Sequence, residues 1–228
     1  MRLAVVGGMG AVAQELVVQA MEAGNFVSWL VKPEDVLPDP ALESDEYAQV
    51  LRVVRGQWDS EEKYSEALHT CDSVAVALDL HHTRAEQLVP TQKLVQKAMR
   101  RHDIKRIILV TTHGCGDSSR RLDWGFWAYL NIQQAFYMVL GTPSLCWSTV
   151  SQYTEQEKVL FAGALQYTVL RPAFVTGGPS TGTYLASPSH VFGGYISAAD
   201  VADCALKALD HEMDVSQTFS VAYSSRVA

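Results

Sequence analysis

The sequence is poor in the features that hold disulfide-rich or metal-dependent modules together. It has 4 cysteines in 228 residues, and no two of them form a C-x-x-C pair. This spacing predicts neither a disulfide framework nor a zinc site. The adjacent His81 and His82 would point to different sides of a strand or a helix, so they do not predict a shared metal ion. We expect no metal site.

Positive charge is also scarce. Lysine and arginine total 18 against 25 acidic residues, which gives a formal net charge of −7 at pH 7. Because nucleic-acid binding depends on clustered basic residues, this balance argues against a nucleic-acid partner. No apolar run is long enough for a membrane helix, and the first residues enter a strand without a secretory pattern. We therefore expect no membrane partner and a cytoplasmic location.

Apolar residues, in contrast, make up 48% of the chain, enough for a well-filled core in one domain spanning residues 1–228. Runs rich in Val, Ile and Leu predict strands at 2–6, 26–31, 51–55, 73–78, 105–112, 166–171 and 217–222. Helical patterns lie between them, at 11–23, 60–69, 84–101, 127–140, 152–163 and 198–210. The alternation predicts an α/β fold of Rossmann type, a doubly wound and mostly parallel sheet with helices on both faces.

The most informative motif lies at the first strand-to-helix junction. Gly7, Gly10 and Ala13 have the spacing G-x-x-G-x-x-A after an apolar strand and before an amphipathic helix. Glycine allows a sharp turn and the close approach of a diphosphate, and a small third residue lets the helix pack on the strand. The first N–H groups of the helix then face an anion. This context predicts a dinucleotide site, and an ordinary strand-helix turn is the alternative.

The second predicted strand ends in a base. Lys32 lies about 20 residues after the glycine turn, where a carboxylate holds the ribose of NAD and a base attracts the 2′-phosphate of NADP. The residue thus predicts NADP(H) as cofactor in preference to NAD(H). A plain surface lysine is the alternative, and the neighbouring Glu34 and Asp35 weaken the charge argument.

The fifth predicted strand runs into the segment VTTHG. Because open α/β sheets bind ligands at the carboxyl ends of their strands, Thr111 and Thr112 should emerge beside a nicotinamide, with His113 next to them. A histidine there could donate a proton, since its ordinary pKa is near neutrality. A hydrogen-bonded loop residue is the alternative for His113.

Two segments should form the substrate side, at about 113–150 and 173–197. Eight aromatic residues occur between residues 124 and 153, a density that suits a flat apolar ligand or a hydrophobic interface. Trp124, Trp127 and Tyr153 are the candidates for substrate contacts. A helix core with a subunit contact is the alternative, so monomer and homodimer both stay open. The second segment is too long for an ordinary connection, which is typical of a functional loop.

Seven segments together resemble the atypical short-chain dehydrogenase/reductase family, nearest to its NAD(P)H-binding, NmrA-like proteins and small flavin and biliverdin reductases. They are VVGGMGAVAQELV, WLVKP, RVVRGQWD, DSVAVALD, RIILVTTHG, EKVLFAGALQYTVLRPAFVTG and YISAADVADCALKAL. The resemblance covers nearly the whole chain. Its most specific piece, LQYTVLRPAFVTG, is similar to the strand and Arg-Pro segment that lies beside the nicotinamide in the family.

The resemblance implies a set of cofactor contacts. The diphosphate would be held by Gly7, Gly8, Met9, Gly10, Ala11 and Val12, and the 2′-phosphate by Lys32. The adenine would lie by Gln57 and Trp58, and a ribose by Leu78. The carboxamide of the nicotinamide would lie near Pro172, Ala173, Phe174 and Val175, and Thr111 would lie at the same end.

The catalytic residues of the main branch of the family are not all present. That branch uses Ser, Tyr and Lys, with Tyr and Lys four residues apart on one helix. In this chain Thr112 stands in the place of the serine, Thr149 in the place of the tyrosine and Tyr153 in the place of the lysine. The nearest Tyr and Lys pair, Tyr153 and Lys158, is five apart, about 140° around a helix. The usual proton-transfer residues are therefore absent.

Three classes of function are compatible with this pattern. The first is an NADPH-dependent reductase of a small apolar or aromatic acceptor such as an enone, quinone or flavin, with water or Tyr153 supplying the proton. The second is a redox-neutral isomerase, dehydratase or cyclase that reuses the pocket. The third is a non-catalytic, NADP-sensing regulator of the NmrA-like kind. The missing triad supports the second and third classes, whereas the aromatic segment and the single domain favour an enzyme, and we rank the reductase first.

Overall fold

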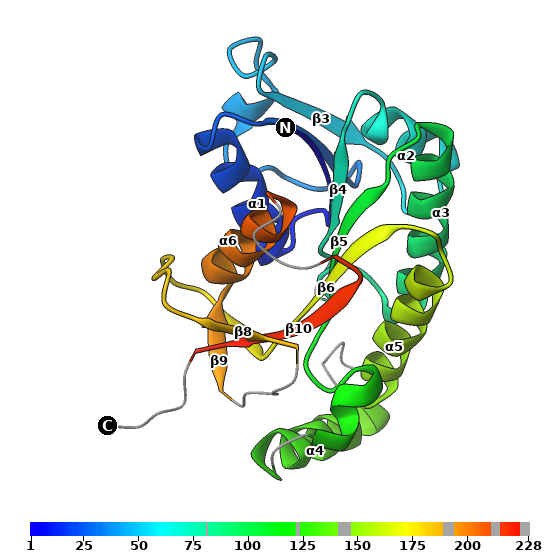
Figure 1. Ribbon diagram of the computed structural model, residues 1–228, viewed down its shortest axis with the longest axis vertical. Helices are drawn as coiled ribbons and strands as arrows, with labels where there is room; N and C mark the ends of the chain where they lie inside the picture. Colours follow the sequence, from blue (N-terminus) through cyan, green and yellow to red (C-terminus); the bar gives the residue numbers. More distant parts are fainter. Residues whose placement is uncertain (81, 122–123, 141–146, 189–193, 211–214, 224–228) are drawn as a thin grey trace.

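A computed structural model describes residues 1–80, 82–121, 124–140, 147–188, 194–210 and 215–223 (Figure 1). His81 and parts of both expected substrate-side segments, 122–123, 141–146 and 189–193, lie outside the described residues. Over the described ranges the centre is an eight-stranded sheet, ordered β3-β2-β1-β4-β5-β6-β10-β8. Its strands are β1 (Arg2–Val6), β2 (Phe26–Val31), β3 (Leu51–Arg55), β4 (Ser73–Val76), β5 (Arg106–Val110), β6 (Gln166–Pro172), β8 (Leu185–Ser187) and β10 (Gln217–Ala222).

All neighbours in this sheet are parallel except β8, which runs antiparallel to β10. A separate parallel pair joins β7 (Phe174–Thr176) to β9 (Tyr195–Ser197). The strand order reverses between β1 and β4, and this reversal opens a crevice outside their carboxyl ends. The sheet therefore has the doubly wound form that the sequence predicts.

Six α-helices cover the described sheet: α1 (Ala11–Glu22), α2 (Glu61–Leu68), α3 (Leu88–Arg101), α4 (Trp124–Leu140), α5 (Trp147–Phe161) and α6 (Ala198–Leu209). Three 3-10 turns accompany them: η1 (Pro40–Glu43), η2 (Ala85–Gln87) and η3 (Gly116–Arg121). In Figure 1, α1 and α6 lie on one face of the sheet, α2, α3 and α5 lie on the other, and α4 extends from the end of α5.

The core has two halves because successive residues of a strand face opposite sides of the sheet. In β1, Leu3 and Val5 pack with α1 and α6, whereas Ala4 and Val6 pack with α2, α3 and α5. All four side chains are fully buried. Each buried Leu or Val stabilises the fold by roughly 1.5–3 kcal/mol relative to an exposed one. The central strands therefore fix the positions of the residues at their carboxyl ends.

The seven predicted strands and six predicted helices are all present, with bounds that differ mainly at their ends. The expected loop 173–197 also contains β7, β8 and β9, each of three residues. Strands this short carry no readable alternation, and their partners lie far away in sequence, so composition alone suggested a loop. Helix α3 begins at Leu88, after η2, rather than at residue 84, which places Pro90 in its first turn, where a missing N–H costs nothing.

Candidate functional site

A cavity of about 550 Å³ lies at the carboxyl ends of β4, β5 and β6 and at the start of α1. It brings together residues that the sequence places near the diphosphate, a ribose, the nicotinamide and the substrate. Those that line it are Ala11, Val12, Leu78, Thr111, Thr112, Tyr153, Pro172, Ala173, Phe174 and Val175. The size falls within the range usual for small-molecule sites.

The glycine turn has a packing reason for its composition. A Cβ on Gly7 would lie 2.4 Å from the carbonyl oxygen of Ala77 and 2.6 Å from the Cβ of Ala13. A Cβ on Gly10 would lie 2.8 Å from the Cβ of Asp79. These separations are too short for carbon, so both positions need glycine for the turn to pass between α1 and the end of β4. Ala13 is the small third residue of the motif.

Helix α1 begins at this turn without a side-chain cap. Its N-cap is Gly10, which makes no side-chain cap hydrogen bond, and no acidic residue lies in the first turn. Ala11 and Val12, its first two residues, line the cavity. An uncapped helix N-terminus presents backbone N–H groups and the positive end of the helix dipole, so this end of the cavity fits a diphosphate.

Two tryptophans enclose the turn from the side. Gly8 has φ +55°, its carbonyl oxygen accepts a hydrogen bond of 3.1 Å from Trp29 Nε1, and the ring of Trp58 lies beside it. Trp58 is only 3% exposed, and its Nε1 has no hydrogen-bond partner among the described residues. Gln57, the other predicted adenine contact, is exposed and donates to Glu34 Oε2 at 3.2 Å. The part of Trp58 that lies beside Gly8 is the carbon edge of its ring, and Trp58 does not line the cavity.

The end of β2 carries charges of both signs. Lys32 Nζ donates to the carbonyl oxygen of His82, in the segment that follows β4. The backbone N–H of Lys32 donates to Asp35 Oδ2 at 2.8 Å, and the same oxygen lies 3.2 Å from the position of a Cβ on Gly8. A base and an acid therefore both lie near the expected adenosine ribose.

At the nicotinamide end, Thr112 and Tyr153 face the same cavity from the end of β5 and from α5. The Tyr153 hydroxyl donates to the carbonyl oxygen of Leu78 at 2.9 Å. Burial, with a smaller contribution from the charge of Asp79, raises the pKa of Tyr153 well above its ordinary value. The tyrosine is thus held as a neutral hydrogen-bond donor in the cavity wall.

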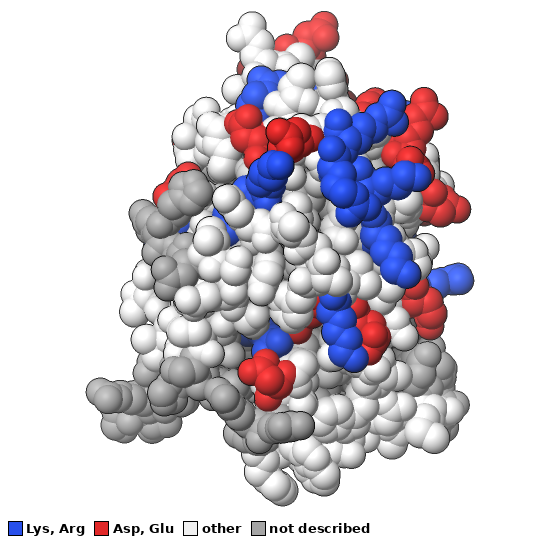
Figure 2. Space-filling view, turned by 45° about the vertical axis from the view of Figure 1, so that its right-hand side comes forward, with Lys and Arg blue, Asp and Glu red and all other residues white. Residues whose placement is uncertain are grey.

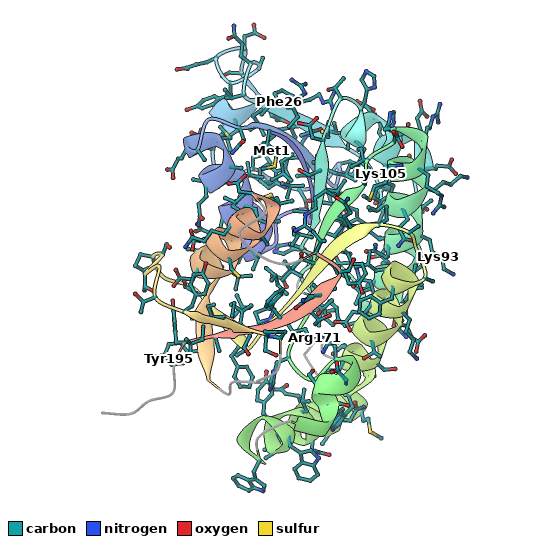
Figure 3. All side chains as sticks on the ribbon, in the orientation of Figure 1. Met1, Phe26, Lys93, Lys105, Arg171 and Tyr195 are labelled. Carbon is teal, nitrogen blue, oxygen red and sulfur yellow. The ribbon has the colours of Figure 1, made fainter. Side chains whose placement is uncertain are left out.

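A buried ion pair lies directly behind this wall. Arg171 of β6 donates from Nε and Nη2 to the two carboxylate oxygens of Glu157 of α5, at 2.9 and 2.7 Å, and from Nη1 to Asp117 Oδ1 at 2.6 Å (Figure 3). Thr111 Oγ1 donates to Glu157 Oε1 at 2.8 Å. Burial alone would lower the pKa of Arg171, but its bonds to Glu157 and Asp117 raise it above the ordinary value. The network joins α5, β6 and the end of β5 at one point.

Three residues that the sequence places at the nicotinamide or substrate end are not brought to the cavity. The predicted diphosphate and adenosine contacts that do not line it are Gly7, Gly8, Met9, Gly10, Lys32, Gln57 and Trp58, of which Met9 is buried in the core. His113 is fully buried, and its backbone N–H donates to the carbonyl oxygen of Pro172 at 2.9 Å. Trp124 and Trp127 of α4 are 81% and 50% exposed and lie on the outer face of that helix. The subunit contact that the sequence offers as an alternative for this aromatic segment stays a prediction. None of the three side chains lines the cavity, so we assign none of them to substrate or cofactor.

The inner face of α4 supplies cavity residues that the sequence analysis missed. Tyr129 and Gln133, one helical turn apart, line the cavity, and Leu130 is buried in the core beside them. The ring of Tyr129 meets the ring of Phe174 edge to face, with centroids 4.6 Å apart. The aromatic density predicts this wall, but a helix with apolar residues all round gives no signal for which side faces inward.

Asp79, Glu157 and Arg171 were also missed. Glu157 and Arg171 had a signal, because each is an ionisable residue at a position where the pattern predicts burial. Glu157 falls on the apolar stripe of its helix with Val150, Tyr153 and Leu160, and Arg171 ends an apolar strand. Charged residues are rarely buried unless they are paired, so two of opposite sign in buried positions predict a pair.

Among the residues that the structure describes, no group of three or more His, Cys, Asp or Glu side chains is placed to hold a metal ion. In the same ranges, no helix combines the length and apolar character needed to cross a membrane.

The glycine turn, the uncapped α1 and the cavity at the strand ends define a dinucleotide-binding protein of the Rossmann class. Residues 7–212 match the family described as NAD(P)H-binding, and the chain belongs to that family. No curated protein matches the chain. The match agrees with the resemblance to atypical short-chain dehydrogenases/reductases and confirms a nicotinamide cofactor.

Solved structures share the fold at low identity. ChuY from Escherichia coli O157:H7, described as an anaerobillin reductase, has a TM-score of 0.76 and 19% identity, covering 100% of this chain and 99% of its own. A short-chain dehydrogenase/reductase from Veillonella parvula in complex with NADP has a TM-score of 0.74 and 17% identity, covering 98% of this chain and 95% of its own. The oxidoreductase ylbE from Lactococcus lactis has a TM-score of 0.73 and 16% identity, covering 98% and 91%.

Proposed function

We propose that the protein is an NADPH-dependent reductase that acts on a small apolar or aromatic acceptor such as an enone, a quinone or a flavin. The observation that carries this proposal is the continuity of one cavity from the uncapped start of α1 to the aromatic wall of Tyr129 and Phe174. A nicotinamide bound there supplies hydride, so the protein has only to dock an acceptor against it. The reductase activity described for ChuY supports the same class.

The proton in this proposal comes from water, with Thr112 binding the acceptor. Tyr153 gives its hydroxyl hydrogen to the carbonyl oxygen of Leu78, and its raised pKa makes it a poor acid near neutral pH. Thr112 lines the cavity at the position of the family serine, so its hydroxyl is placed to hydrogen-bond an acceptor oxygen. His113 neither donates the proton nor binds the acceptor in this proposal, because its side chain does not line the cavity.

NADP(H) is the preferred cofactor in this proposal. Lys32, at the end of β2, directs its ammonium group to the carbonyl oxygen of His82, and a base at this strand end suits a 2′-phosphate. Asp35 opposes this preference, since its carboxylate lies on the same side of the turn. The preference therefore depends on the ammonium group of Lys32 outweighing the Asp35 carboxylate when the 2′-phosphate is present.

The acceptor half of the proposal is tested by NADPH oxidation at 340 nm with menadione, FMN and 2-cyclohexenone as acceptors. Replacing Tyr129 by Ala removes the inner aromatic wall and should lower kcat/KM for the accepted compound about tenfold, the order expected when an aromatic contact is lost. Trp124→Ala, on the outer face of the same helix, is the matched control and should leave kcat/KM within twofold.

The outcome also separates the other two classes of function. Tight NADPH binding without oxidation by any acceptor would favour the NADP-sensing regulator over the reductase. Conversion of a substrate with the cofactor unchanged would favour the redox-neutral enzyme. A loss of activity in Trp124→Ala equal to that in Tyr129→Ala would show that the cavity is not the acceptor site.

A further inference from the structure

We propose that Gln133 selects acceptors that carry two carbonyl groups on one ring, by donating a hydrogen bond from its side-chain amide to the carbonyl oxygen remote from Thr112. This inference rests on the proposed function and deepens it, because it needs an acceptor in the cavity. It names the substrate class as ring 1,4-diones, quinones among them, in preference to simple enones.

The position of Gln133 on α4 is the first observation. The residue is half-buried, follows Tyr129 by one helical turn, and lines the cavity with it. Because residues four apart lie on the same face of a helix, the Gln133 amide neighbours the aromatic wall that Tyr129 forms with Phe174. A flat ring packed on this wall has its edge next to that amide.

The hydrogen-bonding state of the lining is the second observation. Two polar side chains of the cavity wall, Thr112 and Gln133, make no hydrogen bond to any residue that the structure describes. The other polar side chains of the wall all interact within the chain; they are Asp79, Thr111, Tyr129, Tyr153 and Thr176. A threonine hydroxyl and a glutamine amide can each donate a hydrogen bond. These two donors come from different elements, the end of β5 and α4, so they fit an acceptor with an oxygen at each of two positions.

The charge of the wall indicates neutral oxygens. Over the described ranges, no lysine or arginine lines the cavity. A carboxylate on the acceptor would therefore lose hydration without gaining a counter-charge, which is costly. A carbonyl oxygen needs only an N–H or O–H donor. A simple enone offers one such oxygen, which Thr112 takes in the proposed function, and a ring 1,4-dione offers a second one for Gln133.

The test compares two acceptors in NADPH oxidation, 2-cyclohexenone and 2-cyclohexene-1,4-dione, which has the same ring and one more carbonyl group. Gln133→Leu removes the amide and keeps a side chain of similar size. It should lower kcat/KM for the dione about tenfold, the order expected when a hydrogen bond to an enclosed oxygen is lost, and leave kcat/KM for the enone within twofold. Each ratio compares one acceptor in two proteins, so differences in reactivity between the acceptors cancel.

Two further variants sharpen the comparison. Gln133→Glu keeps the oxygen atoms of the side chain but loses the N–H donors when ionised, so it should lower kcat/KM for the dione at least as much as Gln133→Leu. Asn131→Leu removes an exposed amide from the same helix and is the matched control, with both kcat/KM values expected within twofold. Calorimetric titration should give the same Kd for NADPH, within twofold, in Gln133→Leu and the unaltered protein.

The failures are distinguishable. If the unaltered protein oxidises NADPH with neither of these acceptors nor with menadione or FMN, the proposed function fails and the inference fails with it. If it reduces the enone or FMN but not the dione, the inference is wrong and the proposed function stands. Equal losses for dione and enone in Gln133→Leu, or no loss for either, have the same meaning. Weaker NADPH binding by Gln133→Leu would place the amide on the cofactor and would also overturn the inference.

Discussion

At the residue scale, the turn at Gly7 to Gly10 requires glycine for two separate physical reasons. The sequence predicts Gly7 and Gly10 from the space that a diphosphate needs. The structure adds that a Cβ on Gly7 would overlap the backbone of Ala77 and the side chain of Ala13. A substitution at either glycine would therefore disturb the fold as well as the ligand site. Substitutions of side chains at the edge of the turn test ligand binding without this effect on the fold.

Lys32→Ala tests the cofactor preference at this scale. Loss of the ammonium group should weaken NADPH binding by roughly 1.5–3 kcal/mol, the value of a hydrogen bond to a charged group, and should leave NADH binding nearly unchanged. The measurement is calorimetric titration of both cofactors. Lys105→Ala, an exposed residue paired with Asp103, is the control and should change neither affinity. Equal losses for NADPH and NADH would mean that Lys32 does not contact the 2′-phosphate.

At the element scale, the cavity walls depend on contacts between elements that are far apart in sequence. The network around Glu157 joins α5 to β6 and to the end of β5, so the positions of Tyr153, Thr112 and Pro172 are coupled. Periodicity predicts each of these elements separately. It does not predict which element of the sheet Glu157 faces, although its predicted burial and that of Arg171 indicate that each needs a partner of opposite charge.

Glu157→Gln should therefore cost much stability. Removing the Glu157 charge leaves Arg171 with the largely exposed Asp117 as its one remaining counter-charge among the described residues. Breaking a buried pair in this way costs up to about 3–5 kcal/mol. Glu155→Gln is the control on the same helix, since Glu155 is half exposed and forms a surface pair with Lys158 worth at most about 1 kcal/mol. Urea unfolding at neutral pH measures both variants. Similar small losses in the two would show that the Arg171 charge is satisfied by other groups.

The loop after β7 has its own anchor, Asp200 at the start of α6. Its carboxylate accepts hydrogen bonds from the side chains of Ser180, Thr181 and Tyr223 and from the N–H groups of Thr181 and Gly182. Burial would raise the pKa of Asp200, but the bond from Tyr223 and those from the loop outweigh burial and hold it well below the ordinary range. The ionised form is therefore favoured in the folded protein.

This shift sets a pH dependence. A carboxyl whose pKa is lower in the folded than in the unfolded state stabilises the protein above the unfolded value of about 3.9, and the contribution disappears as the pH falls towards the folded value. The free energy of unfolding should thus fall between about pH 5 and pH 2. Asp200→Asn should be less stable at pH 7 by roughly 1–3 kcal/mol and show a flatter decline. An unchanged pH profile in this variant would contradict the role of Asp200.

At the scale of the whole molecule, the alternation of apolar runs and helical patterns predicts the sheet because a parallel sheet buried on both faces needs both. The reversal between β1 and β4 then places the glycine turn, the ends of β4 and β5 and the Arg-Pro segment around one crevice. The sequence does not predict which side of a helix faces outward or how the short strands pair. The outward side of α4, with Trp124 and Trp127, and the short strands β7 to β9 depend on long-range packing.

The charged side chains are unevenly distributed over the face shown in Figure 2. Its upper part carries a contiguous group of Lys and Arg side chains with Asp and Glu around it, and its lower end is largely uncharged. The candidate site lies apart from this group, in the cavity at the carboxyl ends of the strands, and among the described residues no lysine or arginine lines that cavity.

The central claim is that the turn at Gly7 to Gly10 and the start of α1 receive the diphosphate of a nicotinamide cofactor. Calorimetric titration of the purified protein with NADPH, followed by thermal melting at saturation, tests it most directly. We expect one molecule bound per chain and, at a hundredfold excess over Kd, a gain of about 2.7 kcal/mol in the free energy of unfolding. No heat of binding and no change in melting temperature with NADPH or NADH would contradict the account.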